Sequence, residues 1–278
     1  MSLDLILDPL RQGFMQRALV AGTLVGAVGA LLGVFVVQRG LAFLSDGLAH
    51  AAFGGIALGL LLGAGIDHSI WVALPFTVAV SLGISAARRR SGLGGDATTG
   101  VFFAVAFALG VLFLGLRSPG APAVNVESLL FGSILAVSPD VLRAMWLMAG
   151  LTVVLVALFW SRLAYATFDP ELAAIAGVKV AALDRMLLAL VALAVVLGVK
   201  TVGVVLVSAF IVIPAATARL LGGSFAWMAG RAVVLGVVGS AVGLVASYHL
   251  NVASGATIIL VLGAGFFVAL AAPGRGSR

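Results

Sequence analysis

Apolar runs long enough to cross a lipid bilayer recur along the whole chain. A membrane-spanning helix needs roughly 17–25 such residues, and the runs are separated by short breaks that are polar or contain Gly and Pro. They cover roughly residues 18–37, 41–65, 70–87, 100–116, 141–160, 183–199, 202–220, 231–249 and 255–272. The sequence therefore predicts an all-α, polytopic transmembrane helical bundle of nine spans, or of eight if 41–65 is not one full span.

The composition supports a single membrane domain over residues 1–278. Hydrophobic residues make up 63% of the chain and charged residues 9%, whereas soluble domains carry about 25% charged residues. Residues 1–17 lack the basic start and cleavage site of a signal peptide, so we expect an interfacial lead-in. Cysteine is absent, which excludes disulfides, thiolate metal sites and cysteine nucleophiles.

The cations predict the orientation of the bundle. Most lie at the ends of apolar runs, where lipid headgroups and the positive-inside rule explain the net charge of +6 without nucleic acid. Arg88, Arg89 and Arg90 form the strongest cluster, which we place in the cytoplasm together with Arg39. With nine spans in the cytoplasmic (inner) membrane, the N-terminus lies outside and the C-terminus inside. With eight spans, the N-terminus moves inside.

Two connections are longer than turns. Residues 117–140 lie outside, and VESLLFGSIL within them is expected to form a short helix. Residues 161–182 form a cytoplasmic loop, in which Asp169 fits a helix N-cap and Pro170 the first helical position. Glu171 suits the positive end of the helix dipole, and Gly177 ends the helix. This loop predicts a short, capped helix on the cytoplasmic side.

Glycine and proline inside the spans are expected to govern helix packing. Glycines at small-residue spacing, such as those around Gly26 and Gly236, allow helix backbones to approach closely in a membrane. Pro214 falls inside the predicted span 202–220, where it removes a helix hydrogen bond. It serves either as a hinge for alternating access or as a static kink.

Asp46 and His50 are ionisable groups inside an apolar stretch. Four residues separate them, so they share one face of a helix. Counting from Arg39 at the boundary, His50 is expected about 16 Å into a core about 30 Å thick. Ionisable groups at such depth almost always face a cavity, a partner or an ion. The alternative is an internal Asp–His hydrogen bond that joins two helices.

A carboxylate and an imidazole together suit zinc, manganese or ferrous iron. Two ligands are too few for these ions, but a second chain on a two-fold axis would supply another Asp46 and His50. His68 and His249 are weaker candidates, the first in an outer turn and the second at the outer interface. The Met residues are scattered and disfavour copper. The pair thus predicts a transient metal site shared by two protomers.

The sequence contains no nucleotide-binding or hydrolytic motif. GxxxxGK[ST], HExxH and GxSxG are all absent, so we expect no enzyme activity and no covalently bound cofactor. Energy for transport would come from a partner or from an ion gradient. The alternatives are a gradient-driven secondary transporter that uses Asp46 and His50 as a proton relay, and a membrane scaffold that does not transport.

Several blocks resemble the permease subunit of the zinc/manganese/iron (ABC-3) family of metal ABC importers. They occur in the expected order and span most of the chain: FVVQRGLAFLSDGLAHAAFGGIALG, VESLLFGSILAVSP, ATFDPELAAIAGVKV, TVGVVLVSAFIVIPAATARLL and SGATIILV. Departures are modest. Phe53 and Gly54 stand where the family often has Leu-Pro, and His249 and Asn251 where it often has Tyr and Asp.

The resemblance implies a homodimeric permease of an ATP-driven importer. Its partners would be two cytoplasmic ATPase subunits, which bind and hydrolyse ATP, and an extracytoplasmic metal-binding protein that delivers a divalent ion. Asp46 and His50 match the family's positions for transient metal coordination. The segment Asp169, Pro170, Glu171, Ala174 and Gly177 matches the coupling helix that docks into the ATPase.

Overall fold

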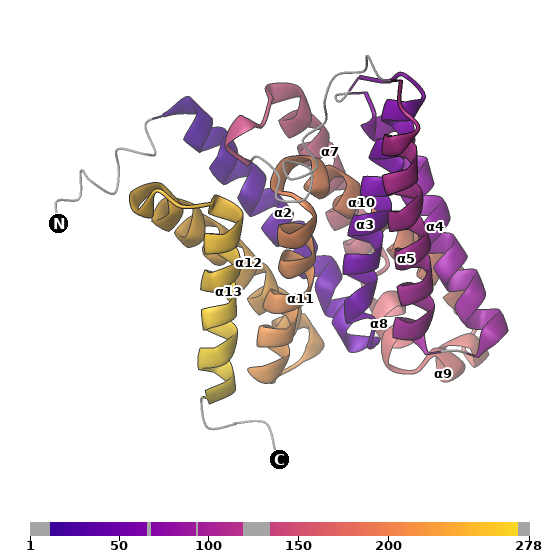
Figure 1. The fold of residues 1–278 in the computed structure, drawn as a ribbon. Helices are drawn as coiled ribbons and strands as arrows, with labels where there is room; N and C mark the ends of the chain where they lie inside the picture. Colours follow the sequence, from indigo (N-terminus) through magenta and orange to yellow (C-terminus); the bar gives the residue numbers. More distant parts are fainter. Residues whose placement is uncertain (1–11, 66–67, 93, 119–133, 272–278) are drawn as a thin grey trace.

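A computed structural model describes residues 12–65, 68–92, 94–118 and 134–271 (Figure 1). Within these ranges every regular element is helical. In chain order they are α2 (Gly13–Gln38), α3 (Ala42–Leu61), α4 (Ile70–Ser91), α5 (Gly95–Gly115), η2 (Ile134–Ala136), α7 (Pro139–Leu158), α8 (Trp160–Phe168), α9 (Pro170–Ile175), α10 (Val180–Val202), α11 (Val204–Leu220), α12 (Phe225–Leu250) and α13 (Ser254–Ala271).

Each predicted span contains a helix, and eight of these helices are long and apolar enough to cross a membrane. The exception is α11, whose 17 residues extend only about 25 Å. The expectation that 41–65 was the span in doubt was wrong. Helix α3 is continuous over 20 residues and is one of the eight.

The two ends of the bundle are distinguished by the short helices α8 and α9, which lie together at one end, here called the α9 end. Figure 1 shows α2 beginning at the opposite end, whereas α13 finishes at the α9 end. The described chain therefore starts and finishes on different sides. This arrangement fits nine passages, with α11 as a short one.

Two expected segments fall partly outside the described residues. Of the 1–17 lead-in, the structure describes 12–17, and Gly13 already begins α2. Of VESLLFGSIL, residues 126–133 are outside, and η2 begins at Ile134. The loop 161–182 holds the expected short helix and also α8, which was not predicted.

Burial divides the helices into a central and an outer group. In α3, 78% of the most apolar window is buried, compared with 17% in α13. Helices α2 and α10 resemble α3, whereas α4, α5 and α7 resemble α13. Large apolar side chains cover the outer surface, among them Trp71, Val105, Leu147, Leu260 and Phe267. Such an apolar exterior is what lipid contact requires, and α3 with its ionisable pair lies inside it.

Glycines allow the closest helix crossings, as the sequence predicted. Helices α2 and α12 meet at Gly26 and Gly236, where a Cβ atom added to Gly26 would lie 2.6 Å from the main-chain oxygen of Gly236. No side chain fits at that distance. Helix α2 also meets α11 at Gly33, where an added Cβ would clash with the main-chain oxygen of Ile211. These contacts fix α2 against the helices that surround it.

Candidate metal site

Asp46 and His50 lie on α3, the most buried span. The helix begins at Ala42, after a turn that contains Gly40. His50 is therefore about 12 Å along the helix from its start. The expected rise of about 16 Å counted residues 39–41 as helical, and they lie outside the helix. Helix α5 packs alongside α3 (Figure 1) and forms one wall of the site.

The His50 ring is held by the main chain of its own helix. Its Nδ1 atom lies 2.9 Å from the main-chain oxygen of Asp46 and 3.7 Å from the Asp46 carboxylate. A carbonyl oxygen only accepts hydrogen bonds, so Nδ1 carries the proton. In the neutral ring the lone pair is then on Nε2, where it can bind a metal. A hydrogen bond on the other ring nitrogen is the usual way to fix a metal-binding histidine.

Two phenylalanines of α5 face His50. The ring centroids of Phe103 and Phe107 lie 4.5 Å and 5.5 Å from that of His50, both edge-on. The side chains of His50 and Asp46 keep 19% and 36% of their surface exposed. The two side chains approach each other only to 3.7 Å within α3, and the hydrogen bond of the ring goes to the main chain rather than to the carboxylate.

The carboxylate of Asp46 contacts a different helix. Its Oδ1 atom lies 3.5 Å from Oγ of Ser208 on α11, at the outer limit of a hydrogen bond. The same hydroxyl lies 3.3 Å from the main-chain oxygen of Val204. Within the described ranges, no third His, Cys, Asp or Glu joins the pair. Ser208 was missed by the sequence analysis, and serine inside an apolar span gives little signal by itself.

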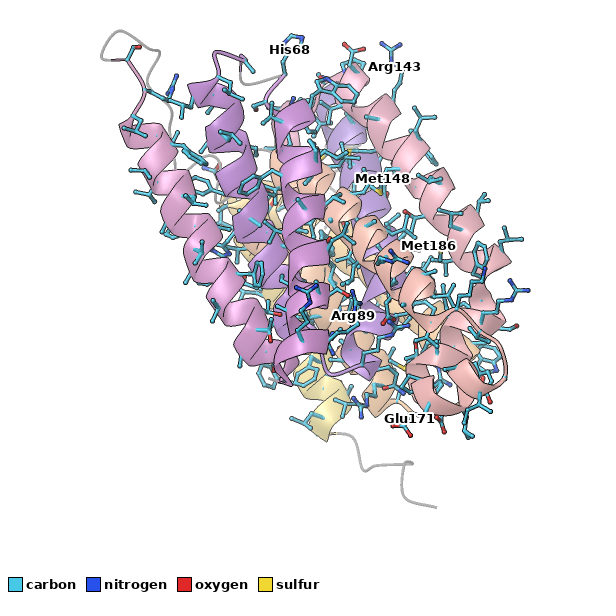
Figure 2. All side chains as sticks on the ribbon, turned by 90° about the vertical axis from the view of Figure 1, so that its right-hand side faces the viewer. His68, Arg89, Arg143, Met148, Glu171 and Met186 are labelled. Carbon is cyan, nitrogen blue, oxygen red and sulfur yellow. The ribbon has the colours of Figure 1, made fainter. Side chains whose placement is uncertain are left out.

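Pro214 lies on α11 as well, six residues after Ser208, and is buried. It leaves the main-chain oxygen of Phe210 without the usual helical donor, yet the helix continues to Leu220. The other two histidines lie away from the site. His68 is exposed at the end opposite α9 (Figure 2), and His249 is exposed near the end of α12.

The predicted cytoplasmic helix has the expected caps. Asp169 Oδ1 accepts a hydrogen bond of 2.9 Å from the Leu172 amide, and Pro170 is the first helical residue. After Ile175 the chain turns at Gly177, whose φ is 81°. Glu171 and Ala174 are exposed, and Glu171 lies at the end of the molecule in Figure 2. Leu172 and Ile175 are also exposed, and they present apolar surface at the α9 end.

Arg39 joins three elements at the same end. Its Nη1 atom lies 2.5 Å from Oδ1 of Asp184 on α10, and its Nε atom donates to Oγ1 of Thr167 on α8 over 3.0 Å. Burial lowers the pKa of the Arg39 guanidinium, and the Asp184 carboxylate opposes that shift. From the sequence, Arg39 was expected only to mark the cytoplasmic boundary. Its partners are more than 120 residues away in sequence, so no local pattern reveals them.

These features are those of a transport subunit embedded in a membrane, and the comparisons with known proteins agree. The chain belongs to the ABC 3 transport family, whose profile matches residues 11–272. The resemblance noted in the sequence is thereby confirmed.

Individual relatives cover almost the whole chain. The manganese transport system membrane protein MntC of Listeria innocua is 34% identical over 274 residues, or 98% of this chain and 96% of MntC. A probable iron transport system membrane protein of Haemophilus influenzae is 32% identical over 274 residues, or 96% and 93% of the two chains. Among solved structures, PsaBC from Streptococcus pneumoniae in complex with Fab matches with a TM-score of 0.83 and 28% identity, over 97% of this chain and 95% of the matched chain.

Proposed function

We propose that the chain is the membrane-spanning subunit of an ATP-driven importer that carries a divalent transition metal across the cytoplasmic membrane. The observation that carries the proposal is the geometry of Asp46 and His50. The imidazole donates a hydrogen bond from Nδ1–H to the main-chain oxygen of Asp46, which leaves the lone pair of Nε2 free for a metal. The carboxylate beside it is one-third exposed and adds an oxygen ligand.

The ligand set favours manganese or ferrous iron over zinc. Asp46, His50 and Ser208 place a carboxylate, an imidazole and a hydroxyl together. Oxygen-rich sets with higher coordination numbers suit manganese, whereas zinc prefers four ligands rich in nitrogen and sulfur. MntC of Listeria innocua is named for manganese transport, and the Haemophilus influenzae relative for iron.

A second copy of the chain completes the coordination. One protomer offers three donor groups, too few to hold manganese against water. A homodimer with its two-fold axis beside the site brings the same groups from both chains. Such a site binds the ion firmly enough to select it and releases it when the protomers separate.

The α9 end is the cytoplasmic side in this proposal. Helix α9 presents Glu171, Ala174, Leu172 and Ile175 as a capped, exposed surface for an ATPase subunit, which binds and hydrolyses ATP. An extracytoplasmic binding protein delivers the ion at the opposite end. Pro214 weakens α11 near Ser208, so movement transmitted from the α9 end bends this helix and opens the site.

The main alternative is a secondary transporter with an Asp46–His50 proton relay. A direct relay needs a hydrogen bond between the carboxylate and the ring, but Nδ1 bonds to the main chain and lies 3.7 Å from the carboxylate. The capped helix at the α9 end also has no purpose in a carrier that works alone. Both observations favour the ATP-driven importer.

Uptake of radioactive manganese by proteoliposomes that contain the chain, its ATPase and its binding protein tests the proposal. Asp46→Asn and His50→Gln each remove a ligand with little change in shape, and we expect uptake to fall more than about tenfold. His68→Gln is the matched control, because His68 is exposed in a turn away from the site. Unchanged uptake in both site variants, with ATP hydrolysis intact, would refute the metal site. Uptake driven by a proton gradient without ATP would refute the importer.

A further inference from the structure

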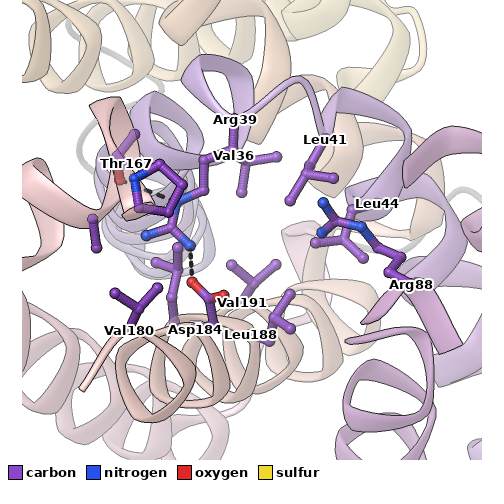
Figure 3. A pocket seen from close by; sticks show the side chains of 13 residues that line it. Val36, Arg39, Leu41, Leu44, Arg88, Thr167, Val180, Asp184, Leu188 and Val191 are labelled. Atoms are coloured by element: carbon purple, nitrogen blue, oxygen red, sulfur yellow. Dashed lines mark hydrogen bonds and ion pairs between the residues drawn. The ribbon is translucent and has the colours of Figure 1, made fainter. Parts of the chain in front are cut away.

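A cavity of about 210 Å³ lies inside the α9 end, separate from the Asp46–His50 site (Figure 3). It is bounded by α2, α3, α4, α8 and α10, and Pro170 of α9 closes part of it. Most of its wall is apolar, with Val36, Leu41, Leu44, Leu187, Leu188 and Val191 among the lining residues. The polar lining groups are the side chains of Arg39, Arg88, Thr167 and Asp184.

The cavity has more positive charge than its own groups neutralise. Asp184 pairs with Arg39 at 2.5 Å, and Figure 3 shows Arg88 facing this pair from the other side of the cavity. Among the described residues, Arg88 has no acidic partner. After burial, which is the main cause, the positive charge of Arg88 also lowers the pKa of Arg39. The Arg39 Nη2 atom is buried without a hydrogen-bond partner in the described part of the chain. A buried charged donor without an acceptor is costly.

The surface beside the cavity is also basic. A groove of about 660 Å³ shares Pro170, Val180 and Asp184 with the cavity. Its other charged lining residues are Arg89, Glu171, Lys179 and Arg185. The groove that leads to the cavity is therefore lined by three more cations but only one more acid. Its net positive charge raises the local concentration of anions.

We propose that this cavity binds a phosphate group between Arg39 and Arg88. A guanidinium pairs with phosphate oxygens through two parallel N–H donors. Arg88 makes no hydrogen bond or ion pair with any described residue and offers this fork to the cavity, while Arg39 adds positive charge from the opposite wall. The phosphate comes either from an anionic phospholipid or from free inorganic phosphate. The apolar wall favours the lipid, because it accepts the first part of an acyl chain. The volume of about 210 Å³ suffices for the phosphate group itself, since a cavity of about 150 Å³ already holds benzene.

Lipid binding to the purified full chain, followed by native mass spectrometry, tests the site. The chain is mixed with phosphatidylglycerol or phosphatidylcholine. Wild type should retain one phosphatidylglycerol about tenfold more tightly than phosphatidylcholine. Arg88→Gln should abolish this preference. Arg90→Gln is the matched control, because Arg90 is exposed in the last turn of the same helix and does not line the cavity.

A second arm identifies the source of the phosphate. Inorganic phosphate is added at constant ionic strength, and the melting temperature of the chain is measured. If free phosphate is the ligand, it stabilises wild type and Arg90→Gln but not Arg88→Gln, and lipid preference is absent. Arg88→Lys keeps the positive charge but loses the paired N–H donors of the guanidinium. It should weaken phosphate binding by a smaller factor than Arg88→Gln. This variant also keeps the test open if Arg88→Gln does not fold.

The proposal is overturned if Arg88→Gln binds phosphatidylglycerol and phosphate as wild type does. It is equally overturned if Arg90→Gln loses as much as Arg88→Gln, because diffuse surface charge then explains the binding. None of these measurements depends on metal transport. Failure of the phosphate site would therefore leave the proposed function untouched, and failure of the proposed function would leave the phosphate site untouched.

Discussion

The two charged clusters of this protein are held in opposite ways. At the α9 end, Arg39 makes short contacts of 2.5 Å and 3.0 Å to two other helices. In the bundle interior, the contact between Asp46 and Ser208 is 3.5 Å long, and the bond of His50 stays within its own helix. The first cluster ties helices together, whereas the second leaves ligand atoms available. The proposed importer needs the second arrangement where it binds and releases an ion, and the first arrangement where movement passes between helices.

The largest stability effect should follow removal of Arg39. Arg39→Gln leaves the Asp184 carboxylate without its cation, and we expect the free energy of unfolding to fall by about 1.5–3 kcal/mol. Asp46→Asn should change it by less than about 0.5 kcal/mol, because its hydrogen bond is long. Melting of the detergent-solubilised chain measures both. Equal losses in the two variants would contradict the contrast between the clusters.

A smaller effect is expected at the cap of α9. Asp169→Ala removes the acceptor for the Leu172 amide and should destabilise the helix by about 1 kcal/mol. Asp169→Asn is the control, because asparagine caps equally well without the charge. Hydrogen exchange of residues 170–176 in the full chain reports the local opening. Faster exchange in Asp169→Ala alone would support the cap, and identical exchange in all three proteins would exclude it.

The smallest effect concerns Ser208. Ser208→Ala removes a neutral oxygen near Asp46, and we expect competition by zinc against manganese uptake to strengthen by a few-fold, corresponding to about 0.5–1 kcal/mol. Ser208→Thr retains the hydroxyl and serves as the control. If Ser208→Ala leaves the competition unchanged, the hydroxyl has no part in selecting the ion.

The spans and the capped helix were predictable from sequence because both depend on local patterns. Apolar run length predicted the spans, and the Asp169–Pro170 pair predicted the start of α9. The spacing of Asp46 and His50 predicted their shared face but not the hydrogen bond to the main chain, which depends on the rotamer of His50. The partners of Arg39 and Asp46 come from distant helices, so only the packed fold brings them together.

The short helix α8 shows a further limit. Its buried Leu163 and Ala166 follow helical spacing, but the segment is too short and too polar on its other face to be read as a span. It was therefore included in the loop 161–182. The hydrogen bond between Thr167 and Arg39 shows that this helix belongs to the junction at the α9 end.

The central claim is that His50 binds the transported ion through nitrogen. Pulsed electron paramagnetic resonance of manganese bound to the purified transporter complex measures this directly, since a coordinated imidazole gives nitrogen modulation of the manganese signal. The account predicts this modulation in wild type and in His68→Gln, and its loss in His50→Gln. Manganese bound to wild type without nitrogen modulation would contradict the account.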